Sequence, residues 1–237
     1  MSAMPLAPPY QATVARKVVV AITGAILYGF VFVHMVGNLQ LYSGPEKINA
    51  YAEFLKSKPP LLWGFRTVLL LAVLTHGLLS LQLWLRNRAA RPVGYARQDF
   101  QAASVASRTM VLSGPLIGLF VVYHLLHLTV GSAHPSFSAT DVYTNVVVGF
   151  QNPLVSAFYV AAMVALGFHL YHGAYSLFQT LGLRTAKWDR LLKVVLTAVS
   201  LVIVVVNISF PIAVLSGVVK PSGAAPAAAG PSTAELR

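Results

Sequence analysis

Cysteine is absent from the 237 residues, and acidic side chains are scarce, with only 6 Asp and Glu. Without cysteine the chain can form no disulfide, no cysteine-ligated iron–sulfur cluster and no covalently attached c-type haem. Charged residues make up 10% of the chain and hydrophobic residues 57%, whereas a soluble domain carries about a quarter charged residues. These shortages argue against a soluble domain and favour a protein whose surroundings are lipid.

The apolar residues are gathered in five stretches, each long enough to cross a bilayer, which takes about 20 helical residues. The stretches are Val18–Tyr42, Leu61–Leu85, Met110–Val130, Pro153–Leu181 and Leu191–Val219. Because backbone groups in lipid must be satisfied within the segment, all five are predicted to be α-helices. No small-residue cleavage site follows the first stretch, so we expect it to remain as a helix. Pro115 and Pro211 predict kinks in the third and fifth helices.

The predicted fold is therefore all-α, an integral membrane bundle of five transmembrane helices within residues 16–219. Residues 1–15 are expected to form an N-terminal tail, and residues 220–237, rich in Ala, Pro, Gly and Ser, a disordered C-terminal tail. Between the first two spans, apolar residues at helical spacing from Ile48 to Leu55 predict a short interfacial helix. The segment 131–152 is expected to be an outer loop.

The formal net charge of +11 is divided unevenly between the two sides of the predicted bundle. One side collects 11 of the 17 Lys and Arg residues: Arg16, Lys17, Arg86, Arg88, Arg91, Arg97, Arg108, Arg184, Lys187, Arg190 and Lys193. The other side holds Lys47, Lys56, Lys58, Arg66, Lys220 and Arg237. This excess predicts that the N-terminus and the richer loops lie in the cytoplasm and the C-terminus outside, in what we expect to be a bacterial cytoplasmic membrane. Membrane topology thus explains the charge, and we expect no binding to nucleic acid.

Six of the seven histidines lie inside predicted spans, where ionisable residues are rare and face the bundle interior. By depth, His34 and His124 share an outer level, whereas His76 and His169 share an inner level. Two histidines at one depth on facing helices can bind one haem iron from both sides, which leaves no open position for a substrate. The sequence therefore predicts two b haems, each held by two histidines, that transfer electrons across the membrane. His134 lies in the outer loop and receives no role.

His127 and His172 follow His124 and His169 by three residues. Each pair could hold a metal ion, but a zinc site usually needs further ligands, and no Asp, Glu or Cys lies nearby in these spans. His127 and His172 are instead candidates for hydrogen bonds to a haem propionate, a carbonyl or a quinone, and a plain interhelical hydrogen bond is the alternative.

Four stretches of the chain carry a family resemblance: 34–39 (HMVGNL), 76–92 (HGLLSLQLWLRNRAARP), 107–129 (SRTMVLSGPLIGLFVVYHLLHLT) and 168–182 (FHLYHGAYSLFQTLG). In this order and spacing they resemble the cytochrome b subunit of succinate dehydrogenases and fumarate reductases, in its single-subunit, five-helix, di-haem class. The resemblance covers about residues 15–218, and it depends on the order of the stretches because none of them is decisive alone.

The resemblance implies that His34 and His124 ligate an outer (distal) haem and that His76 and His169 ligate an inner (proximal) haem. It implies a subunit without dehydrogenase catalysis of its own, which passes electrons between an iron–sulfur subunit and a quinone, with menaquinone as the first expectation. The implied partners are that iron–sulfur subunit and a flavoprotein with covalent FAD, docked on the cytoplasmic face. Some family members carry a glutamate two residues before the fourth ligand, where this chain has Gly167.

Five further residues are candidates for contacts with the cofactors. Arg108 and Ser113, on the inner half of the third helix, are candidates with His172 to donate hydrogen bonds to a propionate of the inner haem, and anchoring of the helix at the interface is the alternative for Arg108. A quinone site near the outer haem would involve Asn49, Tyr51 and Glu53, and an ordinary interfacial helix is the alternative for these three.

Two other functional classes remain open. One is the membrane cytochrome b subunit of another respiratory dehydrogenase, of the hydrogenase or formate dehydrogenase type. The other is a transporter whose intramembrane histidines relay protons or bind ions. The order of the motifs argues against the first, and the scarcity of Asp and Glu in the spans argues against the second.

Overall fold

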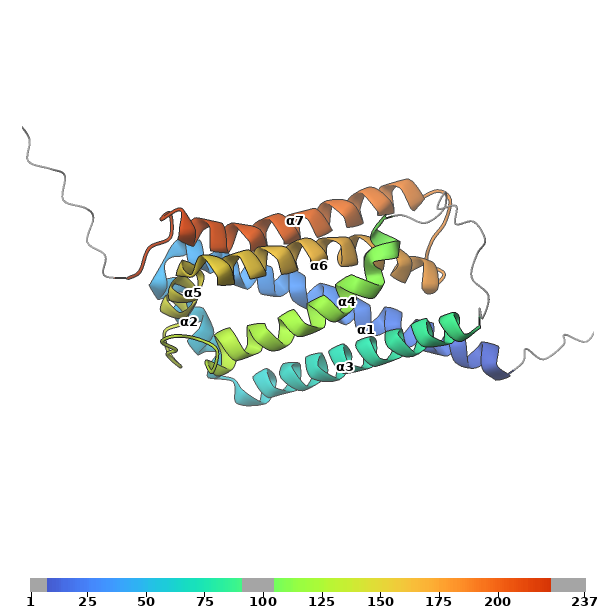
Figure 1. Ribbon diagram of the computed structural model, residues 1–237, viewed down its shortest axis with the longest axis horizontal. Helices are drawn as coiled ribbons and strands as arrows, with labels where there is room; N and C mark the ends of the chain where they lie inside the picture. Colours follow the sequence, from blue (N-terminus) through green and yellow to red (C-terminus); the bar gives the residue numbers. More distant parts are fainter. Residues whose placement is uncertain (1–7, 91–104, 223–237) are drawn as a thin grey trace, which may run out of the picture.

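The computed structural model of the chain describes residues 8–90 and 105–222, and every regular element within them is helical (Figure 1). The α-helices are α1 (Pro8–Asn38), α2 (Pro45–Lys56), α3 (Pro59–Ala89), α4 (Val105–Leu125), α5 (Val142–Gln151), α6 (Pro153–Thr180) and α7 (Asp189–Leu215). A 3₁₀ turn, η1 (Leu39–Ser43), follows α1, and a π-helical turn, η2 (Leu126–Val130), follows α4. The all-α prediction is confirmed.

Five helical segments are long and apolar enough to cross a membrane: Thr13–Ser43, Pro59–Ala89, Ala106–Val130, Pro153–Thr180 and Asp189–Leu215. They coincide with the five predicted spans, so the prediction of a multi-pass membrane protein is confirmed. Helix α1 begins at Pro8 and therefore takes in part of the expected N-terminal tail. Residues 1–7 of that tail, the connection 91–104 with Arg91 and Arg97, and most of the predicted C-terminal tail lie outside the described residues.

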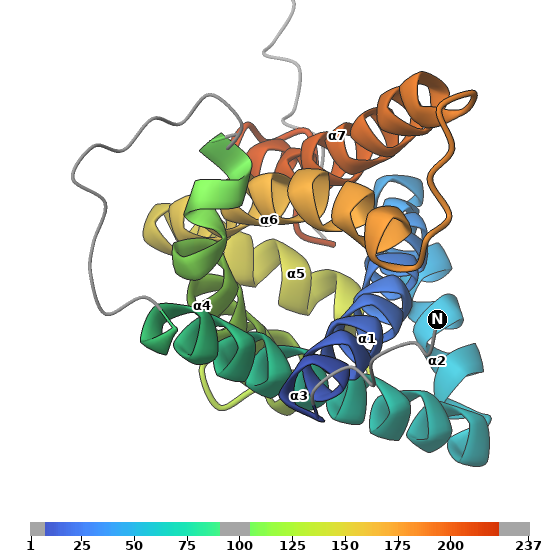
Figure 2. The same cartoon turned by 90° about the vertical axis from the view of Figure 1, so that its right-hand side faces the viewer.

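Helix α6 lies at the centre of the bundle, packed against α7, α4 and α1, and α1 packs in turn along α3 (Figures 1 and 2). Among the described residues, α1 with α4 and α3 with α6 are not closely packed backbone pairs. Helix α4 contains Pro115 and bends along its length (Figure 1), and α7 continues through the buried Pro211. The bundle therefore leaves a separation between the helices that carry the predicted histidine pairs.

Helices α2 and α5 close one end of the bundle, where α1 ends and α6 begins (Figure 1). This end corresponds to the predicted outer side, and α2 confirms that a short helix forms between the first two spans. Side chains of η1, α2 and α5 are almost fully buried here: Leu41, Ile48, Tyr143, Val147 and Phe150. We call this the outer end, and the opposite end, where α6 connects to α7, the inner end.

Helix α5 differs from the prediction, because residues 131–152 were expected to be a loop. The helix begins after Asp141, whose Oδ1 accepts a hydrogen bond of 3.0 Å from the backbone N–H of Thr144 and so caps the first turn. Its 10 residues span about 15 Å, which is too short to cross a bilayer, so the topology of the five spans is unchanged.

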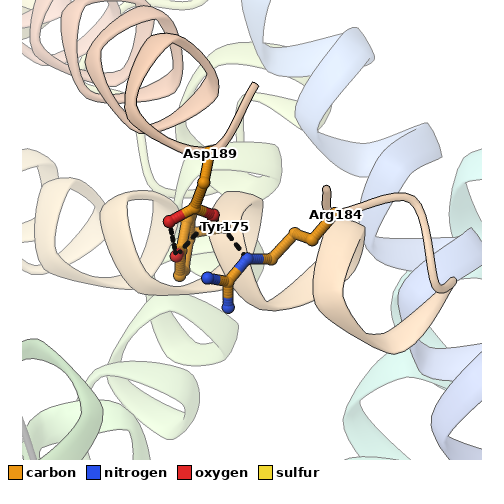
Figure 3. A network of polar contacts seen from close by, with 3 residues as sticks. All are labelled: Tyr175, Arg184 and Asp189. Carbon is orange, nitrogen blue, oxygen red and sulfur yellow. Dashed lines mark hydrogen bonds and ion pairs between the residues drawn. The ribbon is translucent and has the colours of Figure 1, made fainter. Parts of the chain in front are cut away.

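A polar network joins α6 to α7 at the inner end (Figure 3). The carboxylate of Asp189 accepts hydrogen bonds from the Tyr175 hydroxyl at 2.9 Å and from Nε of Arg184 at 2.6 Å. The guanidinium carbon of Arg184 lies 4.4 Å from the centre of the Tyr175 ring. The side chains of Arg184 and Asp189 are about one-third exposed, so this network lies at the surface of the bundle.

Candidate functional site

The four histidines predicted as ligands meet as two pairs, each from two different helices. His34 of α1 faces His124 of α4 at the outer level, with ring centres 5.9 Å apart and ring planes at 85°. His76 of α3 faces His169 of α6 at the inner level, with ring centres 6.2 Å apart and planes at 62°. All four rings are half-buried, so they lie between helices and not out in the lipid.

These separations match the geometry of two imidazoles on one metal ion. A bond from a metal to an imidazole nitrogen is about 2 Å, and the ring centre lies about 1.1 Å further away, so ligands on opposite sides of one iron have ring centres about 6 Å apart. Both observed separations, 5.9 and 6.2 Å, agree with this value. Each pair also bridges two helices whose backbones are not closely packed. This separation provides the space that a planar group between the two histidines would need.

The inner pair has hydrogen-bond partners on Nδ1, the nitrogen that an Nε2-bound metal leaves free. Nδ1 of His76 lies 3.1 Å from the backbone oxygen of Val20 and 3.3 Å from the hydroxyl of Thr23. A carbonyl oxygen can only accept, so Nδ1 of His76 carries the proton and Nε2 keeps its lone pair. Nδ1 of His169 lies 3.4 Å from the hydroxyl of Ser113. Metal-binding histidines usually have such a partner on the second nitrogen.

The space beside the histidines is shaped by glycines. Gly114 of α4 and Gly173 of α6 are half-buried, yet a Cβ on either would meet no other atom within 4 Å. A Cβ on Gly24 of α1, in contrast, would lie 3.2 Å from Cε1 of His76, so this glycine lets the ring approach α1. The ring is thus held from one side while the opposing helices leave open space, and the residues present fit a large flat group such as haem.

Arg16 of α1 is a feature that the sequence analysis counted only as a topology charge. Its Nη1 is buried and has no hydrogen-bond partner among the described residues. Arg16 precedes Thr23 by seven residues, so both lie on one face of α1. A buried, unpaired guanidinium nitrogen costs free energy unless an anion accompanies it. Its chemistry therefore fits a carboxylate such as a haem propionate.

The other candidates on the spans have different surroundings. Ser113 is buried, with its hydroxyl near His169. Arg108 is exposed at the inner part of α4, and His172 is half-buried one turn beyond His169. His127 is 1% exposed, and its Nδ1 lies 2.9 Å from the hydroxyl of Tyr159. His127 thus lies in a protein-lined position, where a hydroxyl already partners Nδ1.

The three quinone candidates lie on α2 at the outer end. Asn49 donates from Nδ2 to Asp141 at 3.0 Å, and its Oδ1 accepts the backbone N–H of Tyr143 at 3.0 Å, so its amide joins α2 to α5. Tyr51 lies against α1, where a Cβ on Gly37 would come within 3.0 Å of the Tyr51 ring. Glu53 is exposed. The structure does not bring these three side chains together at one point.

Outside the two pairs, residues 8–90 and 105–222 contain no group of three or more His, Cys, Asp or Glu side chains that could hold a metal ion. His127 and His134 are ring neighbours, with centres 5.1 Å apart. His134, which received no role from the sequence, is buried and bonded on both nitrogens, to the backbone oxygen of Asn145 and the backbone N–H of Ser136. Its depth in the loop could not be read from the sequence because α5, which covers it, was not predicted.

Five helices that are long and apolar enough to span a membrane, with two facing histidine pairs between them, define a multi-pass membrane protein. Residues 84–207, just over half of the chain, match the family described as Succinate dehydrogenase/Fumarate reductase transmembrane subunit. The chain belongs to this family, which confirms the resemblance seen in its sequence. The match includes His124 and His169 and begins after His34 and His76. Comparisons with curated proteins and with solved structures give no significant match.

Proposed function

We propose that this chain is the cytochrome b anchor of a succinate:quinone or quinol:fumarate oxidoreductase and holds two b haems between its helices. The observation that carries the proposal is the meeting of four histidines as two pairs at two depths. His34 and His124 would hold the outer haem, and His76 and His169 the inner haem. When bound, the haems supply one-electron carriers at two levels between an iron–sulfur subunit and a quinone.

The side chains around the inner pair orient the ligands. The carbonyl of Val20 and the hydroxyl of Thr23 hold the Nδ1 side of His76 against α1, and Ser113 does the same for His169 from α4. Such partners fix the ring orientation and raise the basicity of the ligand. With two histidines to hold each haem, this arrangement would suit electron transfer and would leave no place for a substrate to bind the iron.

Arg16 would neutralise a propionate of the inner haem, since charge-assisted hydrogen bonds stabilise buried carboxylates. Arg108 and His172 remain candidates for the second propionate from α4 and α6. Ser113 fits better as a positioning residue for His169 than as a propionate donor, because its hydroxyl already faces the imidazole.

The inner end is the proposed docking face for the iron–sulfur subunit and, beyond it, the flavoprotein with FAD. Exposed basic residues gather there at the C-terminal end of α3, on the connection before α7 and at the start of α7: Arg86, Arg88, Lys187 and Arg190. With this face in the cytoplasm, the positive-inside rule places the C-terminal end of α7 outside a bacterial cytoplasmic membrane. The quinone, with menaquinone as first expectation, would react near the outer haem, where Tyr51 and Glu53 remain candidates.

The intact membrane complex tests the proposal. Purified complex should contain two haems b per copy of this chain by pyridine haemochrome analysis, together with an iron–sulfur and a flavoprotein subunit. A preparation that oxidises succinate with quinone but contains no haem would overturn the haem proposal. A colourless protein that purifies without partner subunits would instead support a transporter, and a hydrogenase or formate dehydrogenase partner would support the other cytochrome b class.

A further inference from the structure

Tyr159 of α6 stands between two histidines at the outer end of the bundle. Its hydroxyl lies 2.9 Å from Nδ1 of His127 and 3.4 Å from Nδ1 of His124. Tyr159 is 6% exposed and His127 is 1% exposed. Because both groups are buried, water cannot readily replace either partner, and loss of a partner would leave a buried polar group unsatisfied.

The hydrogen bonds that link His124, Tyr159 and His127 have one possible direction if Nε2 of His124 binds iron. Nδ1 of His124 then carries the proton and donates to the Tyr159 oxygen. The Tyr159 hydroxyl has its own hydrogen free to donate to Nδ1 of His127, which is the shorter contact. His127 is consequently neutral with its proton on Nε2. These hydrogen bonds therefore remove no proton from His124, but they place the Tyr159 oxygen as an acceptor beside its Nδ1–H.

His127 cannot turn away from Tyr159, because its ring is enclosed on several sides. Tyr123 stacks on it with ring centres 5.4 Å apart and planes at 21°, and the ring of His134 lies 5.1 Å away. On the side of α5, a Cβ on Gly149 would lie 2.7 Å from Cε1 of His127, closer than carbon atoms approach. Only glycine at position 149 leaves room for the ring. The packing of three elements thus fixes the acceptor that orients the Tyr159 hydroxyl.

We propose that Tyr159 is a positioning residue that lowers the reduction potential of the outer haem through His124, and that His127 orients the Tyr159 hydroxyl for this purpose. The inference rests on the proposed haem at His34 and His124. An acceptor on Nδ1–H makes an imidazole a stronger donor to its metal and stabilises the oxidised, more positive iron. The inner pair has hydroxyl and carbonyl partners of its own, so Tyr159 acts on one haem only.

The test is a redox titration of the purified complex with Tyr159→Phe, following the two haems by their absorption spectra. Both haems should remain, and the outer haem should become easier to reduce by about tenfold, which is about 59 mV for a one-electron couple. The inner haem should keep its midpoint. The low-spin electron paramagnetic resonance signal of the outer haem should shift as well, because the His124 ring is released. Tyr123→Phe is the matched control: this ring stacks on His127 in the same aromatic group, and no change in either midpoint is expected.

Unchanged midpoints and resonance signals in Tyr159→Phe would overturn the inference, while two haems in the wild-type complex would leave the proposed function intact. If the wild-type complex itself contained no haem, the proposed function would be overturned instead. If Tyr159→Phe loses the outer haem through misfolding, Gly149→Ala decides the matter, because it displaces His127 and leaves Tyr159 in place. A shift confined to the outer haem in that variant supports the inference, and its absence overturns it.

Discussion

At the outer end of the bundle, α2, α5 and η1 enclose a continuous buried core, whereas no helix lies across the described part of the inner end. The outer end contains a row of buried polar side chains, among them His127, His134 and Asn145. The inner end carries the partly exposed network of Tyr175, Arg184 and Asp189 instead (Figure 3). Within the described residues, the chain's own helices thus close the outer end but not the inner end, which is the arrangement expected under the proposed function if other subunits cover that face.

The two histidine pairs also differ in the side chains that support them. Aromatic rings support the outer pair, since Phe30 stacks on His34 and Phe120 on His124, with ring centres 5.3 and 5.7 Å apart. A backbone carbonyl and two small hydroxyl side chains support the inner pair. Substitutions should therefore affect one level at a time, and the following variants test that independence.

Removing a ligand should have the largest effect. His34→Ala or His124→Ala is expected to abolish binding of the outer haem, and His76→Ala or His169→Ala binding of the inner haem, because each iron loses an axial ligand. Haem content and reduced absorption spectra of the purified complex measure this. His127→Ala is the matched control and should leave both haems bound. If His127→Ala lost a haem and His124→Ala did not, the ligand assignment would be wrong.

Asn49→Ala should weaken the contact between α2 and α5 without affecting the inner histidine pair. It removes two hydrogen bonds and leaves the N–H of Tyr143 unpaired, which should destabilise the subunit by about 1–3 kcal/mol. Unfolding midpoints in detergent measure the loss, with the exposed Lys47→Gln on the same helix as control. A raised KM for quinone with unchanged unfolding would mean that Asn49 contacts quinone and is not mainly a structural residue.

Arg16→Gln tests the inner level alone. Loss of a positive charge should make the inner haem harder to reduce by about twentyfold, because a unit charge about 10 Å away contributes about 1.7 kcal/mol at an effective dielectric constant of about 20. The outer midpoint should stay unchanged. Lys17→Gln, an exposed neighbour of the same charge, is the control. Equal shifts for both variants would show a general surface-charge effect and exclude a propionate partner.

The smallest effect is a pH dependence at the outer end. Burial raises the pKa of Asp141, but hydrogen bonds from the side chain and backbone of Thr144 and from Asn49 outweigh it and hold the pKa below the ordinary value of 3.8. A carboxyl group with a lowered pKa stabilises the fold fully above its unfolded pKa, and this contribution is lost as pH falls through the folded value. Unfolding midpoints should therefore decline below about pH 4, and less so in Asp141→Asn. Identical pH profiles would contradict the assignment.

The spans, α2 and the two histidine levels were predictable because long apolar runs and ionisable residues inside them are local signals. Helix α5 was missed because its cap, Asp141, and its apolar residues fall in a segment too short to span, whose burial depends on contacts with α2 and α7. Tyr159 and Arg16 were missed for a related reason. A hydroxyl among aromatic residues, or an arginine at a span end, becomes informative only when the partner across the bundle is known.

The π-helical turn η2 has a consequence for reading related sequences. The backbone N–H of Gly131 bonds to the carbonyl of Leu126 five residues earlier, at 3.0 Å, so this turn is wider than an α-helical one. The ring of His127 faces Gly149 of α5 and the ring of His124 faces His34 of α1, yet both reach the Tyr159 hydroxyl of α6. The wider turn begins at Leu126, so it changes the helical phase of the residues that follow His127 and not the face that the two histidines share. A one-residue deletion within 128–130 would restore the α phase and rotate the segment that leads to His134, so an alignment gap at this turn signals a changed connection to α5.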